Sequence, residues 1–317
     1  MAKRLPTEFA INMNLHKMMI LQQSELEYVN QQNYFDEYSP CHLYFVCKRP
    51  RLTIDPGFFK IDDKSISLKL RIHYPDKVKE HQLNFYNNLG TTDAKLESEY
   101  PYSKFKVITD KGVWCDAKVS PFVQMYELNF DSSFLDMDVL YIGQSYGVDG
   151  ARTAPDRLKE HSTLQGIYAE AISNNPDSEI WLALASFNQI NVMMMDGRTK
   201  FTKEELEEDK MRMMHVYNRL NWEGINEQQK INFTEASLIK YFQPPYNKIY
   251  KNTFPNPAHK TYSECYELDI NSVGIEMHTT EMINCKMYSE AVEKSHYHYK
   301  KFLLHSPEER KSMFEIP

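Results

Sequence analysis

The hydrophobic pattern of the first 130 residues changes once, from a helical period to a period of two. In residues 8–32, apolar side chains recur at spacings that share one helix face, so a helix is expected there. From about residue 40 to 130, apolar residues form short runs or alternate with polar ones, most clearly in residues 65–74. Such alternation is typical of half-buried strands. The N-terminal region is therefore expected to be a helix followed by an antiparallel sheet or small sandwich.

Strands and helices follow one another between residues 121 and 253. Short apolar runs predict strands at residues 125–130, 139–142 and 180–187, the first two forming a hairpin. Amphipathic stretches with suitable start and stop residues predict helices at residues 156–172, 202–220 and 234–242. The order hairpin, helix, strand, helix, helix indicates an α+β domain with a small antiparallel sheet flanked by helices.

The last part of the chain follows the Pro-rich stretch Phe-Pro-Asn-Pro at 254–257. The pattern predicts strands at 265–270 and 273–278 and a helix at 288–304. This segment is too small for a core of its own, so it is expected to pack on the earlier parts. We therefore divide the chain into a helix plus β-rich N-terminal domain (1–120), an α+β domain (121–253) and a C-terminal extension (254–317).

Composition narrows the classes of function. The 317 residues hold 37 Lys and Arg against 44 Asp and Glu, which excludes a polybasic protein that coats nucleic acid by charge alone. No apolar run reaches the length of a membrane-spanning helix, and the first residues lack the apolar stretch of a secretory signal. The five cysteines are odd in number and scattered, so we expect no disulfide framework, no membrane association and a cytoplasmic location.

The chain lacks the common metal and phosphate motifs, such as C-x2-C, HExxH, GxxxxGK[ST] and GxGxxG. What remains is a scattered set of phenol, guanidinium, imidazole and carboxylate side chains, at Tyr141, Arg157, His161, Tyr168 and Glu235. Arg157, His161 and Tyr168 share one helix face by their spacing. A carboxylate holds a hard cation such as Mg²⁺, and that cation polarises a phosphate. A guanidinium binds phosphate oxygens by a fork, and a phenol or imidazole positions or deprotonates water. The set is suited to phosphodiester cleavage.

Residues 124–247 resemble the GIY-YIG nuclease superfamily. Tyr141-Ile-Gly143 matches the YIG half, and Arg157-Leu-Lys-Glu-His161 matches the family's Arg-x3-His helix. The stretch 234–247, with its Glu, Leu-Ile, Pro and Asn in order, matches the closing pattern. The GIY half keeps only the tyrosine of Gln-Met-Tyr126.

The resemblance implies a metal-dependent endonuclease that hydrolyses the DNA backbone, with RNA as the alternative substrate. Glu235 would bind a single Mg²⁺ or Mn²⁺. Tyr126 and Tyr141 would line the site, and one of them would orient or activate the water. Arg157 would stabilise the pentacovalent phosphate, and His161 would assist proton transfer or hold the phosphate.

Four further residues belong to the substrate side of the implied site: Gly143, Arg152, Tyr168 and Asn247. The loop between Gly143 and the Arg-x3-His helix is longer than usual, so Arg152 is a rival for the arginine role. Asn247 would fix the local geometry. A role in restriction or anti-phage defence is an extension of this hypothesis.

The charge balance favours an alternative. Residues 121–255 hold 13 Lys and Arg against 19 Asp and Glu, whereas a DNA-cutting domain usually has a basic surface. Substrate binding is therefore expected to need the N-terminal region, which holds the dense basic group Lys48-Arg-Pro-Arg51, a second copy of the chain or another subunit. The methionines at 193–195 and 211–214 are expected in the core or in a soft interface, including one between two copies. The alternative function is a catalytically silent scaffold of the same fold or a nucleic-acid-binding subunit of a complex.

Overall fold

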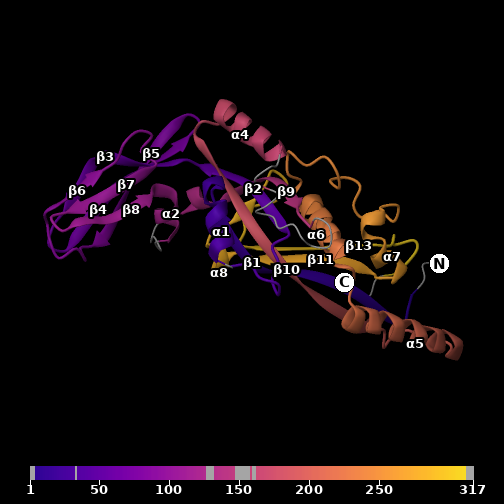
Figure 1. Ribbon diagram of the computed structural model, residues 1–317. Helices are drawn as coiled ribbons and strands as arrows, with labels where there is room; N and C mark the ends of the chain where they lie inside the picture. The colour runs from indigo at the N-terminus through magenta and orange to yellow at the C-terminus, as the bar shows by residue number, and fades with distance from the viewer. Residues whose placement is uncertain (1–3, 33, 126–131, 147–157, 159–161, 312–317) are drawn as a thin grey trace.

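The computed structural model describes residues 4–32, 34–125, 132–146, 158 and 162–311. Within these residues the protein is α+β, with one seven-stranded sheet and two three-stranded antiparallel sheets. The two small sheets form a lobe at one end of the molecule, and helix α5 (Lys203–Asn218) lies at the other end (Figure 1). The expected α+β class is confirmed.

The seven-stranded sheet collects strands from across the chain. Its order is β12 (Met287–Tyr288), β9 (Met137–Gln144), β2 (Leu43–Pro50), β10 (Ser178–Met195), β1 (Thr7–Leu21), β11 (Ser272–His278) and β13 (Tyr297–Leu303). Strands from residues 1–120, 121–253 and 254–317 are therefore hydrogen-bonded neighbours in one sheet. β9, β2 and β10 are antiparallel to one another, and β11 runs parallel to β1.

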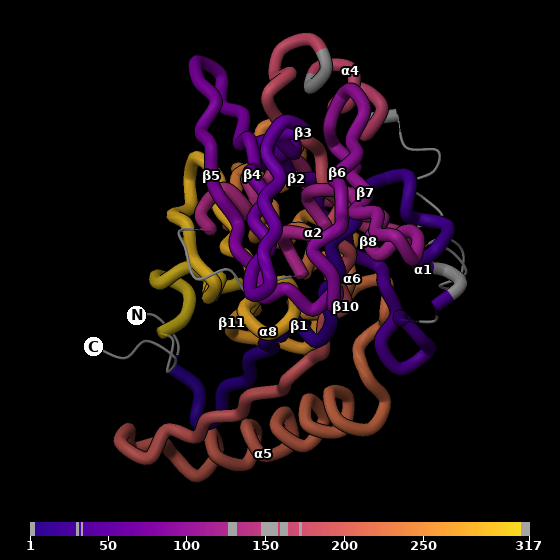
Figure 2. Tube along the Cα trace, turned by 90° about the vertical axis from the view of Figure 1, so that its left-hand side faces the viewer, coloured from indigo at the N-terminus to yellow at the C-terminus, as the bar shows by residue number. Residues whose placement is uncertain are grey.

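The lobe is built from consecutive strands, as the alternating pattern predicted. One sheet is β3 (Leu52–Ile61), β4 (Ser65–Tyr74) and β5 (Lys77–Tyr86), and the other is β6 (Ala94–Glu97), β7 (Lys104–Thr109) and β8 (Gly112–Lys118). Figure 2 shows these strands facing the viewer, with α2 (Val119–Met125) after the last strand. Part of the predicted strand at 125–130 is thus wrong, because Met125 ends this helix, and 126–131 lie outside the described residues.

The predicted helix at 8–32 is mostly wrong. Residues Thr7–Leu21 form β1, which lies between two other strands of the large sheet, and only Leu26–Gln32 form a helix, α1. The first five residues of β1 are all buried, although Thr7 and Glu8 are polar. Apolar and polar residues alternate from Ile11 to His16, which is a strand signal that the helix prediction overlooked. The predicted helix at 288–304 is also strand, in β12 and β13, and the predicted strand at 265–270 begins as helix α7 (Glu264–Glu267).

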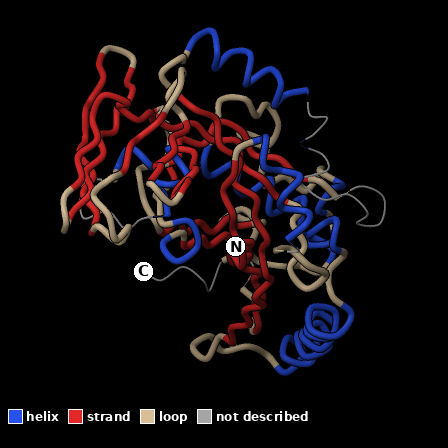
Figure 3. The backbone as a smooth tube through the Cα atoms, turned by 60° about the vertical axis from the view of Figure 1, so that its left-hand side comes forward, coloured by secondary structure: helices blue, strands red, loops and turns tan. Residues whose placement is uncertain are grey.

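Helix α5 confirms the helix predicted after residue 202. Thr202 accepts a hydrogen bond from the Glu205 amide while the Glu205 carboxylate accepts one from the Thr202 amide, which is a capping box. Figure 3 shows this helix set apart from the rest at the end of a long loop-and-strand arm. Several methionines of β10 and α5 are exposed, so a core role is wrong for Met193, Met194, Met195, Met211 and Met214. A contact between two copies stays a prediction.

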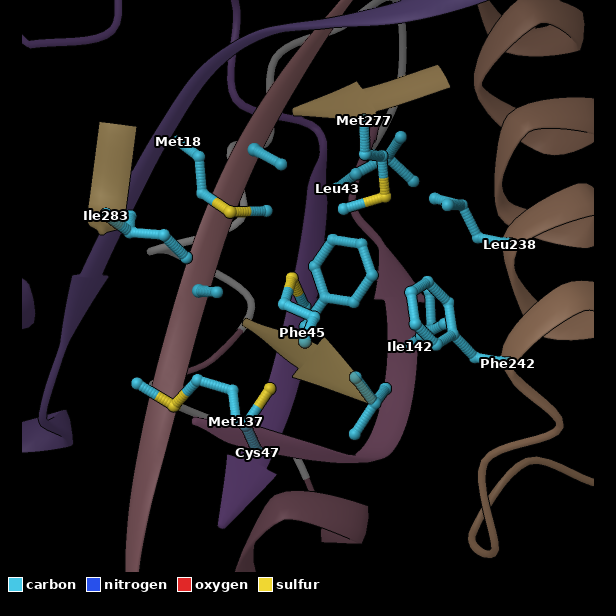
Figure 4. Packing of buried hydrophobic residues seen from close by; sticks show 14 of the residues in the cluster. Met18, Leu43, Phe45, Cys47, Met137, Ile142, Leu238, Phe242, Met277 and Ile283 are labelled. Atoms are coloured by element: carbon cyan, nitrogen blue, oxygen red, sulfur yellow. The ribbon is translucent and has the colours of Figure 1, made fainter. Parts of the chain in front are cut away.

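The large sheet has an apolar cluster on each face. On one face, β2 and β10 pack against α1 and α4 (Ser162–Asn174) through Tyr44, Val46, Leu182 and Leu184. On the other face, the alternate residues pack against α6 (Glu227–Phe242), where the rings of Phe45 and Phe242 meet edge to face at 6.2 Å (Figure 4). The remaining short helices are η1 (Gln23–Glu25), η2 (Ser133–Leu135), η3 (Arg219–Glu223), η4 (Lys260–Tyr262) and α8 (Thr280–Ile283).

Two further expectations concern the whole chain. All five cysteines are free, as their scattered positions predicted. Among the described residues, every helix is too short or too polar to cross a lipid bilayer.

Candidate functional site

A groove of about 600 Å³ lies where β9, α4 and the segment after α6 meet. It is lined by three predicted site residues, Tyr141, Glu235 and Asn247, which come from three separate segments of the chain. The other lining residues are Gly166, Ile167, Glu170, Ile239, Tyr246, Lys248, Ile249 and Tyr250. Residues that are distant in sequence thus share one concave surface.

Asn247 holds the strand that carries Tyr141. Helix α6 ends at Phe242, Gln243 adopts a left-handed conformation at φ 52°, and two prolines turn the chain back toward β9. The Asn247 side chain then accepts a hydrogen bond from the Ile142 amide at 2.9 Å and donates one to the Ile142 carbonyl at 2.8 Å. Both ends of the buried amide are occupied by backbone, so Asn247 fixes geometry at this edge of β9.

Glu235 lies in the third turn of α6, because the helix begins at Glu227 after the N-cap Asn226. The prediction that the helix starts at residue 234 is therefore wrong. The helix dipole, which favours a carboxylate only in the first turn, does not account for Glu235. Its neighbours Thr234 and Ala236 are fully buried, whereas Glu235 is half-buried and lines the groove. An acidic side chain in the buried middle of a helix is uncommon without a polar role.

Tyr44 is the tyrosine that the structure brings next to Tyr141. It lies on β2 directly opposite Gly143 of β9, and its ring centroid is 6.2 Å from that of Tyr141. A Cβ atom on residue 143 would overlap the Tyr44 ring and hydroxyl and come within 2.8 Å of Cε1 of Tyr141. Gly143 is therefore required for the two rings to pack here. The predicted strand around residues 42–47 was the available signal for Tyr44, but nothing local to it indicated that β9 would be its neighbour.

Tyr168 packs away from the groove. It belongs to the apolar cluster that also contains Tyr44 and Ile167, and its hydroxyl accepts a hydrogen bond from the backbone amide of Gln23. Burial raises the pKa of Tyr168 to about 12, so the phenol stays neutral at physiological pH. Ile167, the residue before it, lines the groove and belongs to the same cluster.

Four predicted residues lie outside the described part of the chain: Tyr126, Arg152, Arg157 and His161. Leu158, which is described, is fully buried in the cluster that contains Tyr44 and Ile167. The Leu158 side chain therefore packs against the β2 and α4 side of the sheet.

The charged groups at the groove are mixed in sign. Tyr246 donates a hydrogen bond to the carboxylate of Glu170, and this bond, aided by burial, raises the pKa of Tyr246 to about 12. Lys248 is an exposed cation on the same wall. The described residues of the groove therefore include two carboxylates, three tyrosines and one lysine.

The donor atoms fit one hydrated hard cation. In the part of the chain that the structure describes, no three His, Cys, Asp or Glu side chains come close enough to form a metal-ligand cluster. Glu235 and Tyr141 both line the groove, and Mg²⁺ commonly uses one or two carboxylates and keeps several waters. The Asn247 oxygen is already bonded to backbone. A single-carboxylate Mg²⁺ site is therefore chemically compatible with these residues.

The basic group at residues 48–51 is largely structural. The Arg49 side chain is fully buried, with its guanidinium 3.9 Å from the Trp181 ring centroid. It also donates hydrogen bonds to Glu179 at 3.1 Å and to Gln124 at 2.9 Å. The expectation that this group contacts substrate is therefore wrong for Arg49, because the guanidinium joins β2, β10 and α2 inside the protein.

Comparison with known proteins identifies no relative. No family model, curated protein or solved structure matches the chain. The groove is therefore identified as a candidate site by its geometry and its sequence motifs alone.

Proposed function

We propose that this protein is a metal-dependent endonuclease of GIY-YIG type that hydrolyses phosphodiester bonds of DNA. One observation carries the proposal: Tyr141, Glu235 and Asn247 meet in one groove although they come from β9, from α6 and from the loop after it. The resemblance implied these three residues as parts of a single site. A chance match of short motifs gives no reason for such convergence.

The strand arrangement gives further support. β9, β2 and β10 are adjacent and antiparallel, α4 packs on one face and α6 packs on the other. In this proposal β2 supplies the GIY strand, and Tyr44 takes the place that the sequence analysis gave to Tyr126. The lobe of small sheets is then an insertion between the two motif strands.

The proposed roles follow from exposure to the groove. Bound Mg²⁺ would polarise the phosphate and stabilise the departing oxygen. Glu235 would hold that ion. Tyr141, whose side chain lines the groove, would orient the attacking water, and the buried Tyr44 would position Tyr141. Arg157 and His161 keep the roles implied by the resemblance, stabilising the phosphate and assisting proton transfer.

The test is cleavage of plasmid and single-stranded DNA with and without Mg²⁺. Glu235→Gln removes the charge that would hold the ion while preserving side-chain size, so we expect at least a 100-fold loss of rate, on the order of the loss seen when a transition-state charge partner is removed. Glu227→Gln is the matched control, because Glu227 lies on the same helix and lines a different cavity. Equal cleavage by wild type and Glu235→Gln would refute the role of Glu235. Parallel reactions with RNA decide the substrate class.

A second candidate is a catalytically silent scaffold or nucleic-acid-binding subunit with the same fold. The excess of acidic residues in 121–255 favours it, because a polyanionic substrate is repelled by such a surface. Mn²⁺ binding, measured by electron paramagnetic resonance, separates the two functions. The nuclease is expected to bind an ion and to lose that binding in Glu235→Gln, whereas the scaffold needs no bound ion. Plating phage on cells that express wild type or Glu235→Gln tests the extension to anti-phage defence.

A further inference from the structure

The lobe of small sheets contains a cavity of about 720 Å³ that shares no lining residue with the groove. Its lining comes from β4, β5, β7, β8, α2 and two turns: Lys64, Ser65, Ile66, Leu68, Asn84, Phe85, Tyr86, Asn88, Phe105, Val107, Trp114, Cys115 and Phe122. A volume of this size is within the range of small-molecule binding sites.

The two sheets are in contact along one side and leave the cavity between them on the other. β3 contacts β6 and β7, whereas the cavity is lined by β4 and β5 of one sheet and β7 and β8 of the other. Three phenylalanines form its floor: the ring of Phe122 meets Phe85 at 5.6 Å and Phe105 at 5.0 Å, both edge to face. These rings make one part of the cavity lining aromatic.

Large aromatic side chains stand exposed at the mouth of this cavity. Tyr86 is 86% exposed and Trp114 is 51% exposed. Exposed aromatic rings beside an aromatic interior offer faces on which a planar ring can stack. Ser65, Asn84 and Asn88 also line the cavity. The Ser65 hydroxyl donates to Asp62 and the Asn84 oxygen accepts from Ser67 and Gln82, so the Asn84 amide nitrogen and Asn88 are the groups that would pair with the edge of a base.

The charge of the lobe is opposite in sign to that of the rest of the chain. Residues 51–118 hold 12 Lys and Arg against 10 Asp and Glu, whereas the whole chain holds 37 against 44. Lys64 lies at the cavity, next in sequence to Asp62 and Asp63, whereas Lys77 and Lys79 are exposed at the other end of β5. A polyanion is therefore attracted to this lobe more than to the groove.

We infer that the cavity receives an unstacked nucleobase of single-stranded DNA, with Tyr86 and Trp114 as stacking faces and Lys64 near the backbone phosphate. This inference deepens the proposed function and rests on it for the choice of DNA as the ligand. It assigns substrate recognition to the lobe and chemistry to the groove. A peptide with an aromatic residue is the other class of occupant, and the experiment separates it.

The experiment measures binding of a fluorescently labelled single-stranded oligonucleotide by anisotropy, without Mg²⁺ so that no cleavage occurs. Each stacked base contributes about 1–3 kcal/mol, so Trp114→Ala and Tyr86→Ala are expected to weaken binding by roughly 5-fold to 100-fold. Tyr100→Ala is the matched control, because Tyr100 is 85% exposed in the same lobe and does not line the cavity. An oligonucleotide of the same length with abasic sites is expected to bind as weakly to wild type as the normal oligonucleotide binds to Trp114→Ala.

Three results would overturn the inference. The first is equal binding by Tyr86→Ala, Trp114→Ala and Tyr100→Ala, and the second is equal binding of the normal and abasic oligonucleotides. The third is that aromatic peptides displace the bound DNA whereas free nucleosides do not. The two proposals fail separately. DNA binding that needs Trp114 without any Mg²⁺-dependent cleavage supports the cavity and refutes the nuclease. Cleavage that needs Glu235 with binding indifferent to Trp114 supports the nuclease and refutes the cavity.

Discussion

The groove is built from segments that are far apart in the sequence, whereas the lobe cavity is built from consecutive strands. At the groove, an asparagine bonds to the backbone of a residue 105 positions earlier, and the sheet beneath it pairs strands from the beginning, middle and end of the sequence. In the lobe, β4 and β5 pair along their whole length across a turn of two residues. The lobe can therefore form by local pairing, whereas the groove exists only when the whole sheet is assembled.

The two regions also differ in charge. The groove lies in the acidic part of the chain, and the cavity lies in the basic part. A single-carboxylate metal site needs negative charge, and a nucleic acid needs positive charge, so one surface serves both poorly. The two proposals would resolve this conflict by dividing chemistry and recognition between two regions.

The largest expected difference in stability is between substitutions of two arginines, Arg49 and Arg71. Arg49→Met removes a fully buried guanidinium and leaves the partly buried Glu179 without its cation, so we expect the free energy of unfolding to fall by about 3–5 kcal/mol. Arg71→Met in the lobe breaks a 3.1 Å ion pair with Asp55 whose arginine is 38% exposed, so we expect about 0–1 kcal/mol. Urea unfolding measures both, and equal losses would contradict the difference drawn between the regions.

Asparagines give the second comparison. Asn247→Ala leaves the buried amide and carbonyl of Ile142 without their partner, which costs about 1–3 kcal/mol and is expected to lower cleavage through displacement of β9. Asn87→Ala in the lobe removes bonds to the Asp62 and Thr91 carbonyls, and water can replace them there. Urea unfolding is expected to show the larger loss for Asn247→Ala, and the reverse order would refute its role.

Two glycines at the groove, Gly143 and Gly166, are expected to respond to alanine in opposite directions. Gly143→Ala forces the Tyr44 and Tyr141 rings apart, with an expected loss of about 1–3 kcal/mol. Gly166→Ala, on α4 at the same groove, has open space around its Cβ and is expected to raise stability by about 0.5–1 kcal/mol, because alanine favours a helix. Thermal unfolding measures both, and a stabilising Gly143→Ala would show that the rings do not need that space.

The smallest effect concerns pH. The pKa of Tyr246 is raised to about 12, so its neutral form stabilises the fold below the pKa of an unfolded tyrosine, about 10, and this contribution is lost as the pH rises through 12. Tyr246→Phe is therefore expected to leave the pH profile of cleavage unchanged below pH about 10. A profile that loses an ionisation in that range would assign Tyr246 an acid–base role.

Sequence alone determined the features that depend on neighbours along the chain. The alternating strands of the lobe, the capped start of α5 and the strand β9 follow from spacings of two to four residues. The closing pattern also indicated Glu235 and Asn247, because their spacing is set by one helix and its proline stop. Even so, the pattern placed the helix start incorrectly, since the early turns of α6 carry mixed polar and apolar residues.

Tertiary structure alone decided which distant segments meet. β1 is an inner strand because β10 and β11 pair with it on both sides, whereas the alternation from Ile11 to His16 was already a strand signal in the sequence. Tyr44 lies beside Tyr141 because β2 pairs with β9 across the inserted lobe, and Arg49 is buried because β2 is an inner strand. Pairing between remote strands depends on the total packing of the sheet, which no local period encodes.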